Sequence, residues 1–160
     1  MRELDRLAIA GGTPGYELMS RAGDAALHFV RQRWPTARNL AVICGAGNNG
    51  GDGLVVARLA KAAGLGVRVA LLAEPKRLQG EAAQAAADCR AAGLVFEAFS
   101  AKLLAGADVV VDALLGTGLS RPVSAEFGAA IDAMNGVGKP VLSLDLPSGL
   151  DADSGLSHGV

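Results

Sequence analysis

The feature that most constrains the fold is a glycine-rich turn between an apolar run and a helical pattern. Asn39–Cys44 is a short apolar run of the kind that forms buried strands, and glycine dominates residues 45–53. Residues 51–63 then follow a helical pattern. Such a turn presents backbone N–H groups at a helix N-terminus, where an anion can bind. The spaced glycines of residues 45–50 also match the G-x-G-x-x-G pattern of dinucleotide-binding loops.

Three polar side chains distinguish this turn from a plain dinucleotide loop. A pyrophosphate does not need Asn48, Asn49 or Asp52, and the Asp52 carboxylate would put negative charge where the pyrophosphate binds. We interpret these side chains as ligands of something other than a bare phosphate. In the structural alternative, the two asparagines are turn residues in left-handed conformations, and Asp52 favours the helix start through the macrodipole.

Strand-like and helix-like segments alternate along the chain, which predicts a doubly wound α/β fold with a mostly parallel sheet. We expect strands at Asn39–Cys44, 66–72, 94–97, 108–112 and 140–145, and helices at 51–63, 81–92 and 124–135. All the strands except 94–97 are near-continuous hydrophobic runs, which predicts burial on both faces. Helices at residues 1–10 and 14–33 precede the first strand and are expected to pack on the sheet.

Three of the expected strands end in polar loops that contain glycine, at residues 45–53, 112–122 and 145–155. In an open parallel sheet the carboxyl ends of the strands share one edge, and ligands bind there where the strand order reverses. Right-handed crossovers bring loops that are distant in sequence to that edge. The sequence therefore predicts one cleft lined by these three loops.

The loops carry groups suited to a phosphate and to a cation. Residues 116–118 offer backbone N–H groups and Arg121 offers a positive charge, which together suit a phosphate. Asn49, Asp112 and Ser148 offer oxygen atoms, which suit a hard cation of low charge rather than zinc or copper.

Asp145 directly follows a strand that is expected to be buried, where a partly desolvated carboxylate is suited to proton transfer. Structural interpretations stay open for each of these groups. Asp112 and Asp145 would then be strand-end caps, Arg121 a solvated surface residue, and residues 147–149 only a turn. Two aspartates beside glycine loops favour the functional interpretation.

Composition excludes several classes of function. The 160 residues suffice for one domain with a core, and a net charge of −1 without blocks of like charge argues against nucleic-acid binding. No apolar run reaches transmembrane length and no secretory signal is visible, so we expect a cytoplasmic protein with no membrane partner. Cys44 and Cys89 are expected to be buried free thiols, and the chain has too few Cys and His residues for a metal site built on them.

Three motifs resemble the signatures of the NAD(P)H-hydrate epimerase family, the YjeF N-terminal domain family. The motifs are residues 48–53 (Asn-Asn-Gly-Gly-Asp-Gly), 112–119 (Asp-Ala-Leu-Leu-Gly-Thr-Gly-Leu) and 145–153 (Asp-Leu-Pro-Ser-Gly-Leu-Asp-Ala-Asp). Three long motifs in this order are far more specific than one glycine pattern, and the resemblance runs from about residue 2 to the end of the chain.

The resemblance implies a Rossmann-like, three-layer αβα domain, commonly a homodimer, that interconverts the R and S forms of hydrated NADH and NADPH. It implies a bound potassium ion held by Asn49, Asp112 and Ser148. Asp145 is the candidate general acid and base. The implied substrate contacts are Asn48, Asn49, Gly50, Gly51, Asp52, Gly116, Thr117, Gly118, Leu119, Ser120, Arg121, Pro122 and Asp145.

The resemblance also bears on domain organisation and partners. We expect residues 1–160 to form one YjeF N-terminal domain that lacks its C-terminal end, because the family continues past the third motif. An ADP- or ATP-dependent dehydratase is the expected attached domain or partner. The pair Ser20-Arg21 departs from the family, which often has a Glu-Asn type pair there.

Two other functions are compatible with parts of the pattern. A nicotinamide-dependent oxidoreductase would use the glycine loop, with Glu74 near the position of a ribose-binding acid. The crowding of that loop by Asn48, Asn49 and Asp52 disfavours this function. A non-catalytic nucleotide-binding or scaffold module of the same fold is the second alternative, and the retained polar residues argue against it.

Overall fold

The computed structural model describes residues 2–119 and 122–158, and its centre is a five-stranded sheet in the order β3-β2-β1-β4-β5. Every pair of neighbouring strands is parallel. The strands are β1 (Asn39–Cys44), β2 (Gly66–Leu71), β3 (Phe96–Glu97), β4 (Val109–Ala113) and β5 (Val141–Ser143). The predicted doubly wound α/β fold is confirmed.

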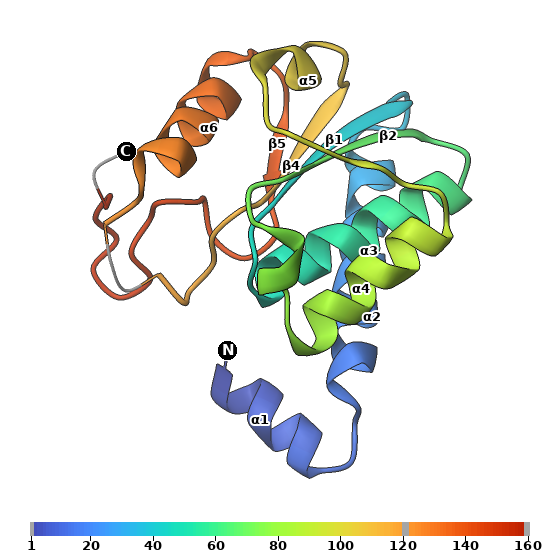
Figure 1. Ribbon diagram of the computed structural model, residues 1–160, viewed down its shortest axis with the longest axis vertical. Helices are drawn as coiled ribbons and strands as arrows, with labels where there is room; N and C mark the ends of the chain where they lie inside the picture. Colours follow the sequence, from blue (N-terminus) through green and yellow to red (C-terminus); the bar gives the residue numbers. More distant parts are fainter. Residues whose placement is uncertain (1, 120–121, 159–160) are drawn as a thin grey trace.

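Helices cover both faces of the sheet (Figure 1). One face carries α3 (Asn48–Ala62) and α4 (Gly80–Ala91), and the other carries α5 (Ala101–Ala105) and α6 (Ala125–Gly136). Strand β1 contributes to both layers because its side chains alternate between the faces. Leu40, Val42 and Cys44 belong to the core under α3 and α4, whereas Ala41 and Ile43 belong to the core under α5 and α6. This arrangement confirms the three-layer αβα architecture.

The two N-terminal helices differ in how they are held. Helix α2 (Gly15–Arg33) packs closely against α3, because a Cβ built on Gly23 would lie 2.5 Å from Val55 Cγ1. Helix α1 (Arg2–Ala10) extends from the body of the protein, as Figure 1 shows, and Leu7 and Ile9 are about half exposed. The expectation that both helices pack on the sheet was therefore wrong for α1.

The observed boundaries differ from the expected ones where tertiary contacts decide. The first α/β helix begins at Asn48 rather than residue 51, and β5 ends at Ser143 rather than residue 145. Strand β5 lies at the edge of the sheet with Val141 exposed, so the prediction that it is buried on both faces was wrong. Helix α5 and the short 3-10 helix at Pro75–Arg77 were not predicted, since both lie in segments without a long hydrophobic period. Within the described ranges, no helix has the length and hydrophobicity needed to cross a membrane.

Candidate active site at the carboxyl edge of the sheet

The strand order reverses between β1 and β4, and the three predicted loops meet at this point. From β1 the chain proceeds to β2 and β3 on one side, whereas β4 and β5 lie on the other. The ends of β1 and β4 pair at Cys44 and Ala113, and Asp112 pairs with Ser143 of β5. The loops after β1, β4 and β5 are therefore neighbours, as the sequence predicted.

Asp112 is the buried centre of this edge, with a relative exposure of only 3%. Its Oδ1 accepts hydrogen bonds from Ser148 Oγ at 2.6 Å and from the Leu114 amide at 3.2 Å. Its Oδ2 accepts from the Ser148 amide at 2.8 Å and from Ser143 Oγ at 3.2 Å. A buried carboxylate needs such partners because burial without them is costly. The carboxylate thereby joins the end of β4 to the loop after β5.

Ser148 and Asn49 both contact the backbone of Leu115, the second residue after β4. The Leu115 amide donates to Ser148 Oγ at 2.9 Å, and Asn49 Nδ2 donates to the Leu115 carbonyl oxygen at 2.8 Å. The three residues predicted to hold a cation are therefore brought together around this short segment.

The side-chain oxygen of Asn49 is an orphaned acceptor. Asn49 Oδ1 is buried and has no hydrogen-bond partner among the described residues. Buried acceptors in native proteins rarely lack a partner, so this atom is suited to a ligand. Together with the oxygens of Ser148 and Asp112, it forms a donor set that fits a hard cation of low charge. In the described part of the chain, no cluster of three His, Cys, Asp or Glu side chains is arranged for a metal.

Asp145 lies against the loop after β4. Its Oδ2 accepts a hydrogen bond from the Thr117 amide at 2.7 Å. A Cβ built on Gly116 would lie 2.5 Å from the same oxygen and 3.3 Å from Asn49 Cβ, so only glycine permits this approach. The carboxylate itself is exposed, whereas the sequence interpretation assumed that it is partly desolvated. Asp145 is therefore a solvent-exposed carboxylate that is held against the loop after β4.

The glycine-rich loop after β1 continues directly into α3. Helix α3 has Gly47 at its N-cap without a side-chain cap, so its first backbone N–H groups can meet an anion. Gly50 lies in this first turn, where a Cβ would be 2.0 Å from the Gly45 carbonyl oxygen. The exposed Asn48 and half-buried Asn49 are thus helical, and no non-glycine residue among those described has a positive φ. The left-handed-turn interpretation of the asparagines was wrong.

Asp52 is the fifth residue of α3 and is half-buried. The macrodipole acts mainly within the first turn, so the helix-start interpretation of this carboxylate is weakened. Gly51 is buried in the same segment, where a Cβ would lie 2.5 Å from Met19 Cε. Gly51 therefore fits α3 closely against α2.

The predicted phosphate loop is only partly open. The Thr117 amide donates to Asp145, and the Leu119 amide donates to the Gly116 carbonyl oxygen at 3.1 Å. Thr117, Gly118 and Pro122 are exposed, and Leu119 is half-buried. Of the backbone N–H groups that were expected to be open at residues 116–118, that of Thr117 is bonded to Asp145. Ser120 and Arg121 lie outside the described residues.

Sequence reasoning missed Asp151 and His158. His158 Nε2 lies 3.0 Å from Asp151 Oδ2, and the Ser154 amide and hydroxyl each donate to Asp151 Oδ1 at 2.7 Å. Hydrogen bonds from Ser154, and then from His158, hold the pKa of the Asp151 carboxyl well below its usual range. The pattern Asp-x-x-Ser at 151–154 is typical of a side-chain-bonded turn and was the available signal.

The remaining candidates are two buried thiols and one surface carboxylate. Cys44 and Cys89 are free and buried, as predicted, and burial raises the pKa of Cys89 to about 11 and that of Cys44 further. Glu74, the ribose-binding candidate of the oxidoreductase alternative, pairs on the surface with Lys76 at 2.9 Å.

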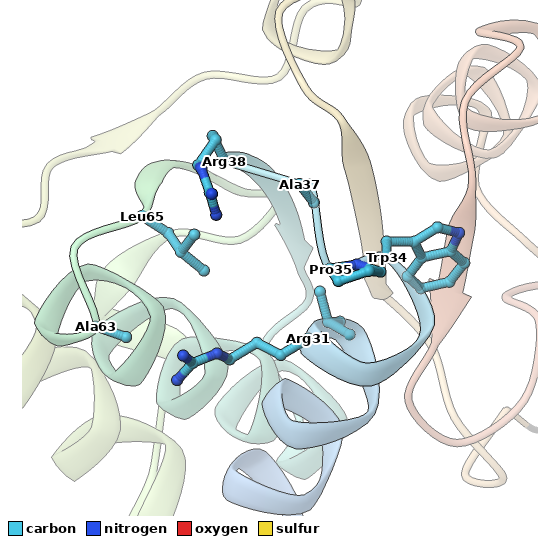
Figure 2. Close-up of a pocket in the computed structure, with 8 residues that line it drawn as sticks. Arg31, Trp34, Pro35, Ala37, Arg38, Ala63 and Leu65 are labelled. Atoms are coloured by element: carbon cyan, nitrogen blue, oxygen red, sulfur yellow. The ribbon is translucent and has the colours of Figure 1, made fainter.

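A cavity of about 270 Å³ lies elsewhere, at the amino end of the sheet (Figure 2). Arg31 and Arg38 extend toward it from the end of α2 and the start of β1. Its lining residues are Val30, Arg31, Trp34, Pro35, Ala37, Arg38, Ala63 and Leu65. Since β1 begins at Asn39 and β2 at Gly66, this cavity is at the opposite edge from the three loops.

Known proteins resemble this chain in sequence and in fold. The chain is 51% identical over 159 residues to the bifunctional NAD(P)H-hydrate repair enzyme Nnr of Coxiella burnetii, covering 99% of this chain and 33% of that protein. It is 44% identical over 162 residues to the NAD(P)H-hydrate epimerase of Rhodobacter capsulatus, covering 96% of this chain and 76% of that protein. The chain thus spans about a third of the length of the bifunctional relative.

A solved structure and a family description complete the comparison. The crystal structure of yeast ynu0 superimposes with a TM-score of 0.81 at 26% sequence identity, covering 89% of this chain and 65% of that one. The family described as YjeF-related protein N-terminus matches residues 15–160. The three motifs of the carboxyl edge all lie inside the matched range. The chain belongs to the YjeF-related protein N-terminus family.

Proposed function

We propose that this chain is an epimerase that interconverts the R and S forms of hydrated NADH and NADPH. The names of relatives that are 44–51% identical support this activity over the oxidoreductase and over a non-catalytic module. The observation that carries the proposal is the contact of the Asp145 carboxylate with the Thr117 amide beside Asn49. This contact brings an exposed carboxylate next to the loop after β4, the candidate phosphate-binding loop. It also lies beside Asn49, a candidate ligand of the cation.

The proposed substrate contacts follow the two loops next to the strand-order reversal. The uncapped start of α3 offers helix N-terminal N–H groups to the substrate, and Asn48, Gly50, Gly51 and Asp52 lie in this first part of the helix. The loop after β4 covers the other side of the substrate. Its members in this proposal are Gly116, Thr117, Gly118, Leu119, Ser120, Arg121 and Pro122.

Asn49, Asp112 and Ser148 are proposed to hold a potassium ion. The orphaned Asn49 Oδ1 and the buried Asp112 carboxylate support this set, since a monovalent cation would satisfy the former and offset the charge of the latter. The bound cation would supply a fixed positive charge beside the cleft, with little Lewis acidity. These side chains then keep the loops after β1, β4 and β5 in one arrangement.

Asp145 is proposed as the general acid and base. The protonated carboxyl donates its proton to the C6 hydroxyl, the C6–O bond breaks, and the lone pair of the adjacent ring nitrogen forms a C=N bond as water leaves. A water molecule then adds to C6 from the opposite face, and the proton that it releases returns through solvent to the exposed Asp145 carboxylate, which completes the inversion. Ring opening at the same carbon is the alternative route. There the carboxylate takes the proton of the C6 hydroxyl, the bond between C6 and the ring nitrogen breaks to leave an aldehyde, and the nitrogen gains a proton. Closure on the other face of the aldehyde reverses these transfers. General acid–base catalysis of this kind contributes about 10²–10⁴ in rate.

We also propose a partner activity, an oligomeric state and a location for this chain. A dehydratase activity is proposed for the part of the bifunctional relatives that lies outside the matched region, and this chain is proposed to act as a homodimer in the cytoplasm. The two buried free thiols fit a reducing compartment.

Conversion of purified R-hydrate, followed by chromatography, tests the activity. The wild-type chain should bring the R and S forms to equilibrium, and Asp145→Asn should slow this by about 10²–10⁴. Asp153→Asn is the matched control, because Asp153 is an exposed aspartate in the same loop. Undiminished turnover by a folded Asp145→Asn chain would remove Asp145 from the acid–base role. A wild-type chain that leaves the R-hydrate unchanged would refute the activity itself.

A further inference from the structure

The chain folds back on itself after Ser148. Leu150 and Ser157 form an antiparallel bridge, and the Asp151 amide donates to the Leu156 carbonyl oxygen at 2.8 Å. The Gly155 amide closes the turn by donating to the Asp151 carbonyl oxygen at 3.0 Å. We call residues 149–158 the return loop.

The Asp151 carboxylate organises the return loop from inside. Oδ1 accepts from the Ser154 amide and hydroxyl, each at 2.7 Å, and from the Asp153 amide at 3.2 Å. Oδ2 lies 3.0 Å from His158 Nε2, and both side chains are about three-quarters covered. Hydrogen bonds to a carboxylate are stronger than those between neutral groups, so this one side chain is central to the loop.

His158 connects the return loop to two loops of the candidate site. Its amide donates to the Gly149 carbonyl oxygen at 2.8 Å, directly beside Ser148. Its carbonyl oxygen accepts from the Val123 amide at 3.4 Å, directly after the phosphate-loop candidate. The position of the His158 backbone therefore links the loop after β5 to the loop after β4.

We propose that Asp151 and His158 are positioning residues, which hold the loop after β4 against the loop after β5 and so keep the substrate cleft assembled. This role rests on the proposed epimerase activity, since it acts on binding of the same hydrate. Neither side chain needs to contact the substrate. If the two loops are ordered before the substrate binds, binding does not carry the entropy cost of ordering them. The protein therefore binds the substrate more tightly.

The expected kinetic effect is on KM. If loss of the Asp151 hydrogen bonds leaves the assembled cleft populated only about a tenth of the time, the KM for the hydrate rises about tenfold. Asp145 is untouched, so kcat at saturating substrate should stay within about threefold of wild type.

Four variants provide the test. Asp151→Ala removes every carboxylate bond, and His158→Ala removes the pairing with Oδ2. His158→Gln retains an amide N–H that can reach the position of Nε2. It should therefore reverse most of the rise in KM that His158→Ala causes. Asp153→Asn is the control, because the Asp153 side chain is exposed and contributes only its backbone amide to Asp151. All four are assayed with the hydrate and by backbone hydrogen exchange without substrate.

The two readouts separate this proposal from the proposed function. Faster exchange at Val123 in Asp151→Ala and His158→Ala, with a raised KM and preserved kcat, supports positioning. Wild-type exchange at Val123 in Asp151→Ala, or KM values equal to those of Asp153→Asn, overturns it, and so does a failure of His158→Gln to rescue. If the wild-type chain has no epimerase activity, the proposed function fails, whereas hydrogen exchange still decides whether Asp151 ties the two loops.

Discussion

Ser148 Oγ donates a hydrogen bond to Asp112 Oδ1 across 2.6 Å, and both side chains are buried. The same hydroxyl accepts from the Leu115 amide at 2.9 Å. One serine thus satisfies a buried carboxylate and a backbone donor of a different loop. This relationship makes the carboxyl edge of the sheet a connected polar network, in which loss of one member leaves others without partners.

Ser148→Ala should destabilise the fold by about 1–3 kcal/mol, because it removes a partner from the buried Asp112 carboxylate and another from the Leu115 amide. Urea unfolding followed by circular dichroism measures the effect. Ser100→Ala is the control, since Ser100 is exposed and its side chain makes no cap hydrogen bond to α5. It should change stability by no more than about 0.5 kcal/mol. Equal effects of the two substitutions would contradict the network.

Replacing sodium or lithium with potassium should stabilise the wild-type chain, because a ligand of the native state shifts unfolding by mass action. At ten times the dissociation constant the gain is about 1.4 kcal/mol, measured as a rise in the thermal midpoint. Asn49→Ala should abolish the response by removing the orphaned Oδ1, whereas Asn48→Ala, at an exposed position, should retain it. A response of Asn49→Ala that matches wild type would exclude Asn49 as a ligand.

Gly116→Ala should lower epimerase turnover by about tenfold or more, because the new Cβ would lie 2.5 Å from Asp145 Oδ2 and would displace this carboxylate. Gly106→Ala is the matched control, since nothing lies within 4 Å of a Cβ at that position. Both rates are measured by chromatographic conversion of the R-hydrate. Turnover of Gly116→Ala equal to that of Gly106→Ala would show that the Asp145 position does not matter.

Stability should fall above pH 9, because burial raises the pKa of Cys89 to about 11 from an ordinary value near 9. The contribution of the protonated Cys89 thiol to the free energy of unfolding is fully present below the pKa of the unfolded state. It is lost as pH rises through the pKa of the folded state, since the thiol ionises first in the unfolded chain. Urea unfolding between pH 8 and 11 measures this loss. Cys89→Ala should flatten the profile in that window, and an unchanged slope would contradict the assignment. Cys44, whose thiol is also protected by burial, remains in both chains.

Much of the fold could be predicted from local patterns. The hydrophobic runs of β1 and β4 predicted buried central strands, because a side chain buried on either face must be apolar. The glycine-rich segment predicted the turn into α3, and the order of strands and helices predicted one shared edge for the three loops. The grouping of Asn49, Asp112 and Ser148 was also predicted, both from the shared edge of the three loops and from the family motifs.

Other features depend on residues that are far apart in the chain, and no local pattern reports them. The edge position of β5 follows from the strand order, and the apolar Val141 that suggested burial is exposed there. Asn48 and Asn49 are helical, because α3 has its N-cap at Gly47. The sequence Asn-Gly favours a turn, so the local pattern did not predict this earlier helix start. The contacts of Asp145 with Thr117 and of His158 with Asp151 depend on how the loops fold against one another.

The sequence by itself determined the doubly wound architecture and the chemical groups available at its carboxyl edge, because hydrophobic period and glycine position act on the chain locally. Only the tertiary structure decided which groups share a hydrogen bond, which carboxylate is buried, and which acceptor is left without a partner. Asp112 and Asp145 illustrate the difference, since each comes after a largely apolar run in the sequence. Packing of the loop after β5 buries Asp112 under Ser148 and leaves Asp145 exposed to solvent beside the loop after β4.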